Sequence, residues 1–475
     1  MDVEVALGGG KPFSYGYTDP FRLACGCSVK VDLEEVVYPA LRKVSAELAS
    51  LGVRFNRRDD VDVIEGVGVR DLSLRRVVYR LGSGQLEAQG IRDLAPSRVV
   101  ALFSVEQGTG SDVGRFSSKL LEAYSTLARS AGPVFVGKAH SILGAHSTDN
   151  EVAVFDLIST RGRSEDSCVL VNNCTVRTID PTRGPGDYFQ VATAIGNSLN
   201  DLFCNGVYKS LTILPVFDMP NGDLISMASE NIRRYCGEHG FVLQPEHELG
   251  LGEVMIGATV LGESDKCPPD FGSEVMPGDL VLVTRPLGEL AILSLYLALN
   301  ILGEEFLGRM DAPAEVVERY RDEAVSLMVR PNLEVARIIS RYLPTRREKF
   351  DPELHVKEST DISGPGILAI GELARNFGFS VTIEDIPLLN RDLVELAVKL
   401  GLVTNGTSGT NGAIALIGSP KLVACIQEEL YKAGYEPSVI GKVEGKGEAG
   451  LRIDRGLEGR LFPRGPFLHF SMRGP

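Results

Sequence analysis

Two cysteines separated by one glycine, Cys25 and Cys27, stand directly before a predicted helix. Asp32 and Glu35 have the spacing of a capping box, and apolar residues recur at helical spacing from Val37 onward. A helix N-terminus lowers the pKa of a nearby thiol, so this position favours a reactive cysteine. The eight cysteines of the chain include no C-x-x-C pair, which argues against a structural zinc site.

Two aspartates occupy positions that suit phosphate and metal chemistry. Asp201 shares a face with Asn197 on a helix predicted over 186–206. Asp361 lies in the turn T-D-I-S-G-P-G, where glycines let the backbone approach a ligand and a following helix presents its amide groups. Carboxylates near phosphates usually hold Mg²⁺, although an aspartate in such a turn is often only a helix cap. The pattern indicates a metal–nucleotide site that is not built on a P-loop.

A second glycine-rich turn, N-G-T-S-G-T-N-G, follows at 405–412 and has similar chemistry.

Alternating strands and helices must position these residues. In the C-terminal half, Pro286 is predicted to open a helix and Pro331 to interrupt one. Strands are predicted at 151–157, 167–173 and 253–262, helices at 287–301 and 315–342, and a strand, turn and helix at 358–378, with the alternation continuing to 443.

The overall composition is that of a globular protein with two or three domains. The chain has 475 residues, 44% of them hydrophobic, and a formal net charge of −14. The acidic balance argues against nucleic acid or an anionic membrane as a partner. No apolar run is long enough to cross a bilayer, and the first residues lack the pattern of a signal peptide. We therefore expect a cytoplasmic protein.

The order of the motifs resembles selenophosphate synthetase (selenide, water dikinase), within the ATP-binding superfamily that includes aminoimidazole ribonucleotide synthetase. The motifs are C-G-C, A-T-x-x-x-N-S-L-N-D-L-F-x-x-G, V-T-R-P-L-G, T-D-I-S-G-P-G, T-S-G and V-I-G-K-V. The resemblance covers most of residues 20–30 and 145–453. It implies a two-domain α/β (α+β) fold, with an N-terminal sheet that forms a dimer barrel and a C-terminal α/β domain.

Four segments follow from this interpretation. They are a glycine-rich arm at 1–24, an ATP-binding domain at 25–270 with an insertion at about 53–135, a C-terminal domain at 275–455, and a tail at 456–475.

The resemblance also implies an activity and a set of site residues. Selenide would be phosphorylated with ATP and water to give selenophosphate, AMP and phosphate, with Mg²⁺ and, as a further candidate, K⁺. The implied catalytic residues are Cys25 and Lys30. The implied nucleotide-binding residues are Asn197, Thr360, Gly364, Thr407 and Ser408. The implied metal ligands are Asp149 or Glu151, Asp201 and Asp361.

Three departures from the family pattern leave alternatives open. Ser28 stands where the family has a catalytic lysine, and Lys30 follows two residues later. Glu151 aligns with a metal-binding aspartate, and Cys174 replaces an acidic residue. The alternatives are a related Mg-ATP-dependent kinase or synthetase acting on sulfide or a small metabolite, as in thiamine-phosphate kinase of the same superfamily, or a non-catalytic nucleotide-binding paralogue. In each case the family implies a homodimer.

Overall fold

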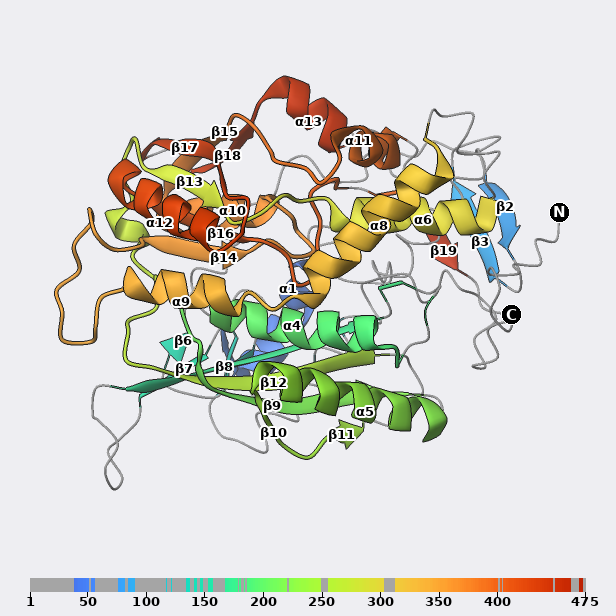
Figure 1. Ribbon diagram of the computed structural model, residues 1–475, viewed down its shortest axis with the longest axis horizontal. Helices are drawn as coiled ribbons and strands as arrows, with labels where there is room; N and C mark the ends of the chain where they lie inside the picture. The colour runs from blue at the N-terminus through green and yellow to red at the C-terminus, as the bar shows by residue number, and fades with distance from the viewer. Residues whose placement is uncertain are drawn as a thin grey trace.

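The computed structural model describes the region from 167 to 462 almost continuously, together with shorter segments on either side (Figure 1). Gaps within that region fall at 178, 181–182, 184–185, 220–221, 249–254, 303–311, 400–401, 404 and 447–448. The shorter segments are 38–50, 53–55, 76–81, 84–89, 117, 121, 134–136, 141–142, 146–147, 153–156 and 470–472. Several residues singled out in the sequence lie outside the described residues: Cys25, Cys27, Ser28, Lys30, Asp32, Glu35, Asp149 and Glu151.

A seven-stranded sheet organises the N-terminal half, in the order β10-β9-β12-β8-β7-β6, with β11 pairing β9. Strand β12 is antiparallel to both β8 and β9, whereas the short strands β10 and β11 pair with β9 in parallel. The three strands predicted here are confirmed as β7, β8 and β12, whereas β9 contains Pro215 and gives a weaker strand signal. The strands are β6 His146–Ser147, β7 Ala153–Asp156, β8 Cys168–Arg177, β9 Lys209–Asp218, β10 Val242–Leu243, β11 His247–Glu248 and β12 Met255–Ser264.

A six-stranded sheet organises the C-terminal half, in the order β14-β16-β13-β17-β15-β18. The predicted break at Pro331 separates α8 from α9, but α6 begins at Glu289 rather than at Pro286. The strands are β13 Leu280–Val283, β14 Glu358–Asp361, β15 Phe379–Ile383, β16 Ile414–Gly418, β17 Ser438–Lys446 and β18 Gly450–Ile453. The helices are α6 Glu289–Leu302, α8 Ala314–Val329, α9 Leu333–Arg341, α10 Leu368–Phe377, α11 Arg391–Lys399, α12 Pro420–Lys432 and α13 Arg455–Leu461.

Helices α4 (Tyr188–Cys204) and α5 (Gly222–His239) cover one face of the N-terminal sheet. Figure 1 shows α4 between that sheet and the C-terminal half above it. It contacts β8 and β12 on one side, and α8, α9, β14 and β16 on the other. Every residue from Phe189 to Cys204 is buried, so the polar face predicted for this helix is enclosed by the protein instead of facing solvent.

The two halves share a hydrophobic core because the C-terminal sheet uses both of its faces. In β13, Leu282 joins the core that contains α4 and the N-terminal sheet, whereas Val281 and Val283 join a second core under α6, α10 and α11. The two-residue side-chain period of a strand produces this division. The chain is thus a mixed α/β protein built on two sheets, which confirms the predicted fold class.

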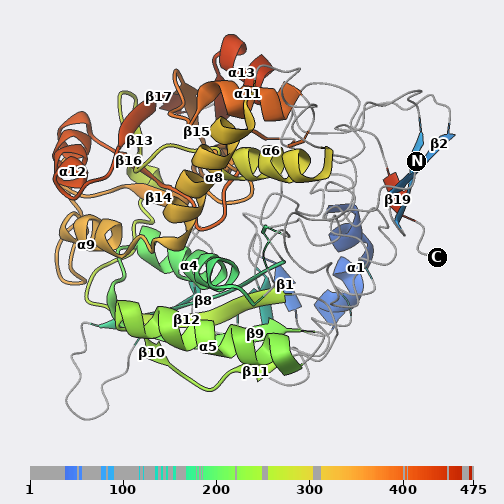
Figure 2. The ribbon, with the colours of Figure 1, turned by 45° about the vertical axis from the view of Figure 1, so that its right-hand side comes forward.

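The remaining described elements include two small sheets, the helix α1 and a 3-10 turn at Gly272–Glu274. Helix α1, Tyr38–Ser50, lies where the sequence predicts a helix after the C-G-C pair, and it contacts β1 (Figure 2). Among the described helices, none combines the length and apolar character needed to cross a membrane. The small strands are β1 Val53–Phe55, β2 Arg76–Leu81, β3 Gly84–Gln89, β4 Val134–Val136, β5 Ser141–Ile142 and β19 Phe470–Met472.

Candidate functional site

Asp201 lies on α4 with its carboxylate against the N-terminal sheet. It is 8% exposed, and its Oδ2 accepts a hydrogen bond from the side-chain amide of Asn172 on β8. One turn earlier, the Asn197 amide donates to the Cys174 sulfur at 3.0 Å. Cys174 occupies the position where the resemblance expects an acidic ligand. The structure therefore places Asn197, Asp201 and Cys174 in the α4–β8 contact, with the thiol hydrogen-bonded to Asn197.

Asp361 is carried to the same boundary by β14. The Ser359 hydroxyl donates to the Cys204 carbonyl, in the last turn of α4, at 2.6 Å. Alternate residues of a strand share a face, so Asp361 lies on the face of β14 that contacts α4. The two aspartates, far apart in sequence, thus lie on elements that pack against each other, α4 and β14. Thr360, between Ser359 and Asp361, is half-buried on the alternate face.

The two glycine-rich turns are joined by side-chain hydroxyls. Ser408 Oγ donates to the Gly364 carbonyl at 2.8 Å, and Thr407 Oγ1 accepts from the Ile367 amide at 3.1 Å. Thr407 also donates to Asn405 Oδ1 at 2.6 Å. Both hydroxyl residues are at most 2% exposed. In this structure Thr407 and Ser408 hold the Gly364 turn in place, and their contact with a nucleotide stays a prediction.

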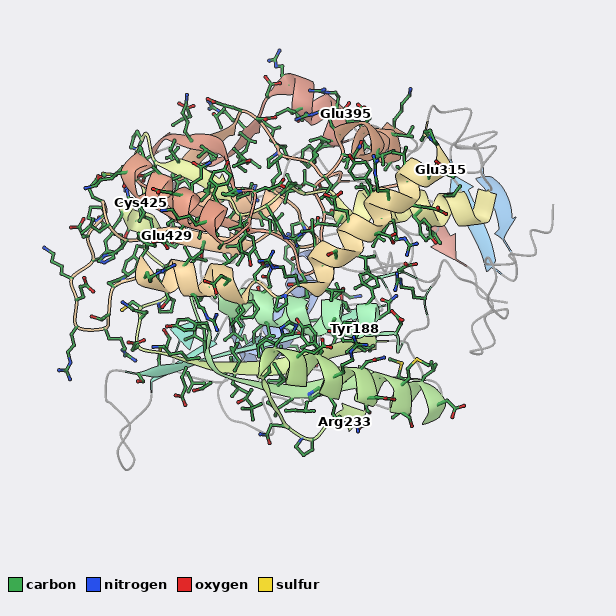
Figure 3. All side chains as sticks on the ribbon, viewed as in Figure 1. Tyr188, Arg233, Glu315, Glu395, Cys425 and Glu429 are labelled. Carbon is green, nitrogen blue, oxygen red and sulfur yellow. The ribbon has the colours of Figure 1, made fainter. Side chains whose placement is uncertain are left out.

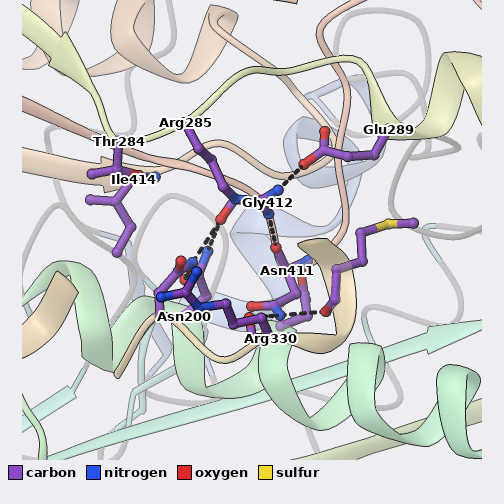
Figure 4. A network of polar contacts seen from close by, with 11 residues as sticks. Asn200, Thr284, Arg285, Glu289, Arg330, Asn411, Gly412 and Ile414 are labelled. Carbon is purple, nitrogen blue, oxygen red and sulfur yellow. Dashed lines mark hydrogen bonds and ion pairs between the residues drawn. The ribbon is translucent and has the colours of Figure 1, made fainter. Parts of the chain in front are cut away.

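A buried ion pair beside these turns was not singled out from the sequence. Arg285 Nη1 lies 2.7 Å from Glu289 Oε1, and both side chains are at most 4% exposed. Arg285 Nη2 donates to the Asn411 carbonyl at 2.6 Å (Figure 4). Burial raises the pKa of Glu289 above its ordinary value, although the Arg285 charge opposes that shift. The V-T-R-P-L-G motif contains Arg285 and was the available signal for this pair.

Asparagines connect the turn at 405–412 to helices of both halves. Asn200 Nδ2 donates to the Gly412 carbonyl at 3.2 Å. Asn332, just before α9, donates to the same carbonyl at 2.8 Å and to Asn200 Oδ1 at 2.7 Å. The Asn411 amide N–H donates to Asn197 Oδ1 at 3.0 Å. Single asparagines carry no sequence signal of such a role, since they are more often turn or surface residues.

The carboxylates of Asp201 and Asp361 supply some, but not all, of the oxygen ligands that a hard cation such as Mg²⁺ needs. Mg²⁺ prefers carboxylate oxygens and is bound through one or two carboxylates together with phosphates, which Asp201 and Asp361 could supply. Within the residues that the structure describes, no group of three or more His, Cys, Asp or Glu side chains forms a ready metal cluster. The other predicted ligands, Asp149 and Glu151, lie outside the described residues.

Comparisons with known proteins describe a likeness of fold. No protein-family model and no curated protein matches the sequence. Thiamine monophosphate kinase from Stenotrophomonas maltophilia superposes with a TM-score of 0.43 and 13% identity, over 70% of this chain and 95% of that chain. The corresponding kinase from Aquifex aeolicus gives a TM-score of 0.41 and 16% identity, over 61% of this chain and 88% of that chain.

A third similar structure is PurL from T. maritima complexed with ATP. It superposes with a TM-score of 0.39 and 14% identity, over 64% of this chain and 43% of that chain. At these TM-scores the overlap assigns neither a substrate nor a residue role to this chain.

Proposed function

We propose that this chain binds ATP with Mg²⁺ at the boundary between its halves and transfers a phosphoryl group to a small acceptor. Selenide is the first candidate acceptor, because the motif order resembles selenophosphate synthetase. One observation carries the proposal: Asp201 is on α4, and Asp361 is on β14, which packs against that helix beside two glycine-rich turns that are hydrogen-bonded to each other. Carboxylates next to glycine-rich turns suit a metal-bound polyphosphate.

The residues of the boundary divide into metal and nucleotide roles. Asp201 and Asp361 would hold Mg²⁺, with Asp149 or Glu151 as a further ligand. A bound Mg²⁺ would neutralise charge on the phosphates. The backbone around Thr360 and Gly364 would approach the phosphates, with Ser408 fixing that turn through its bond to Gly364.

The transfer step follows from the proposed acceptor. Selenide would attack the γ-phosphorus of ATP, the bond from that phosphorus to the bridging oxygen would break, and selenophosphate and ADP would form. Water would then split ADP into AMP and phosphate. Cys25 would handle the chalcogen, since a soft thiolate suits selenium, and Lys30 would supply positive charge near the transferring group.

A second candidate is favoured by the departures at Ser28 and Cys174. Loss of the lysine after C-G-C and of one acidic position fits an ATP-dependent enzyme with another acceptor, such as sulfide or a small metabolite. A nucleotide-binding protein without catalysis would fit the same losses. For each candidate we propose a homodimer, which light scattering at micromolar concentration would test.

The deciding experiment follows ATP by phosphorus NMR in the presence of Mg²⁺ and K⁺, with and without anaerobic selenide. A product with a phosphorus–selenium bond, formed together with AMP only when selenide is present, is expected. ATP that stays intact, or is converted to ADP at the same rate without selenide, would contradict the selenide reaction. The same samples with sulfide in place of selenide would separate the first candidate from the second.

A further inference from the structure

Asn411 has a backbone conformation that is unusual for a residue with a side chain. Its φ is +50°, and among the described non-glycine residues only Ser210 shares a positive φ. Asn411 is fully buried. Left-handed backbone costs about 1 kcal/mol or more for most residues, and asparagine tolerates it better than other residues with a side chain. A strained residue in a buried position points to a requirement of the surrounding structure.

The backbone N–H, the backbone carbonyl and the side-chain amide of Asn411 are each hydrogen-bonded to another segment of the chain. Its N–H donates to Asn197 on α4, and its carbonyl accepts from Arg285 after β13. Its side-chain amide donates to the carbonyls of Met328, at 2.6 Å, and Arg330, at 3.1 Å, where α8 ends (Figure 4). One residue therefore joins α4 of the N-terminal half to two separate segments of the C-terminal half.

The contact between α4 and Asn411 requires a glycine. A Cβ atom on Gly196 would lie 2.6 Å from Asn411 Nδ2 and 2.8 Å from its Cγ. Gly196 precedes Asn197, and Asp201 follows one turn later on the same helix. The close approach at Gly196 and the hydrogen bond at Asn197 thus set the position of α4 against the turn at 405–412.

We propose that Asn411 is a positioning residue for the metal-dependent nucleotide site. It holds α4, and with it Asp201, at a set position relative to the turn that contains Gly364, because both are bonded to the segment 405–412. This role rests on the proposed function. In this role Asn411 affects the Mg²⁺ concentration that nucleotide binding requires, although Asn411 itself does not contact the nucleotide.

A double-mutant cycle between positions 196 and 411 tests the proposal. Binding of the β,γ-methylene analogue of ATP is titrated by calorimetry over a range of Mg²⁺ concentrations, and the melting temperature of each variant is recorded. Gly196→Ala is expected to raise the Mg²⁺ concentration for half-maximal binding by about tenfold, because the added Cβ would strike the Asn411 side chain and displace α4. Asn411→Gly keeps the left-handed backbone and is expected to raise it by about threefold.

The double variant carries the decisive comparison. In the Asn411→Gly background, Gly196→Ala is expected to change the Mg²⁺ midpoint by less than about twofold, because the amide that it would strike is gone. Gly237→Ala is the matched control, since a Cβ there meets nothing within 4 Å and Gly237 also lies inside a helix. That control is expected to leave the midpoint unchanged.

Two outcomes would overturn the proposal in distinguishable ways. If wild-type protein binds the analogue and the variants lower only the melting temperature, with an unchanged Mg²⁺ midpoint, Asn411 is structural and the positioning role is wrong. If wild-type protein binds no analogue at any Mg²⁺ concentration, the proposed function fails and the role fails with it. Asn411→Gly adds no atoms, so it provides the test even if Gly196→Ala does not fold.

Discussion

At the scale of single residues, Asp201 carries a carboxylate that is hydrogen-bonded to β8. Its Oδ2 accepts from Asn172, a bond that an asparagine oxygen could also accept. We therefore expect Asp201→Asn to fold normally but to lower the affinity for Mg·ATP by at least about tenfold, since a neutral amide is a weaker ligand for Mg²⁺. Calorimetric titration with ATP and Mg²⁺ measures the loss.

The control for this substitution is Asp223→Asn, an exposed carboxylate in the first turn of α5. It removes the same charge away from the boundary between the halves and should leave nucleotide affinity unchanged. Equal affinity of Asp201→Asn and the wild-type protein would remove Asp201 from the metal site.

The cysteines differ in reactivity because their surroundings differ. Burial raises the pKa of the Cys236 thiol to about 11, so roughly one molecule in a thousand carries the thiolate at pH 8. Cys425 is exposed on α12 (Figure 3). Iodoacetamide at pH 8 should therefore modify Cys425 and spare Cys236, as peptide mass mapping would detect. Comparable modification of both cysteines in folded protein would contradict this expectation, and urea should abolish the difference.

At the scale of elements, the start of α4 depends on a side-chain cap. Asp187 Oδ1 accepts from the Phe189 amide at 2.9 Å. Replacing it with alanine leaves that amide without its cap, and we expect Asp187→Ala to lower the free energy of unfolding by about 1 kcal/mol. Asp187→Ser keeps an acceptor and should lose much less. Urea unfolding followed by circular dichroism would measure both, and equal losses would show that the cap contributes nothing.

At the scale of the whole molecule, a buried ion pair ties the start of the C-terminal half to β14. Lys357 Nζ lies 2.8 and 2.7 Å from the two carboxylate oxygens of Asp279, and the side chains are 0% and 4% exposed. Lys357→Met leaves a buried carboxylate without its cation, so we expect a loss of about 3–5 kcal/mol in unfolding free energy.

The matched variant for this pair removes the charge on both sides. Asp279→Asn in the Lys357→Met background is neutral and still accepts from the Met276 amide, as Asp279 does at 2.7 Å. It should recover a large part of the loss in chemical denaturation. A double variant no more stable than Lys357→Met would show that the lost packing of the lysine, and not the unpaired charge, dominates.

The sequence by itself determined many of the elements and their order, because the signals for them are local. Apolar spacing predicted α4 and the helix pair around Pro331, and glycine turns predicted the connection from β14 to α10. Motif order pointed to the two aspartates. Hydrophobic periodicity, helix capping and turn preferences each depend on residues that are close together in the chain. A single sequence is therefore enough to predict the elements that they produce.

Only the tertiary structure decided what encloses the polar face of α4. The pattern of that helix is the same whether Asn197 and Asp201 face water or the protein interior. The structure buries both: Asp201 is hydrogen-bonded to β8 of the N-terminal sheet, and Asn197 to both β8 and the C-terminal half. The bonds of Asn411 to Asn197 and Arg285 join segments that no periodicity relates. Such contacts depend on how whole elements pack, and for that reason the positioning residues became visible only in the folded chain.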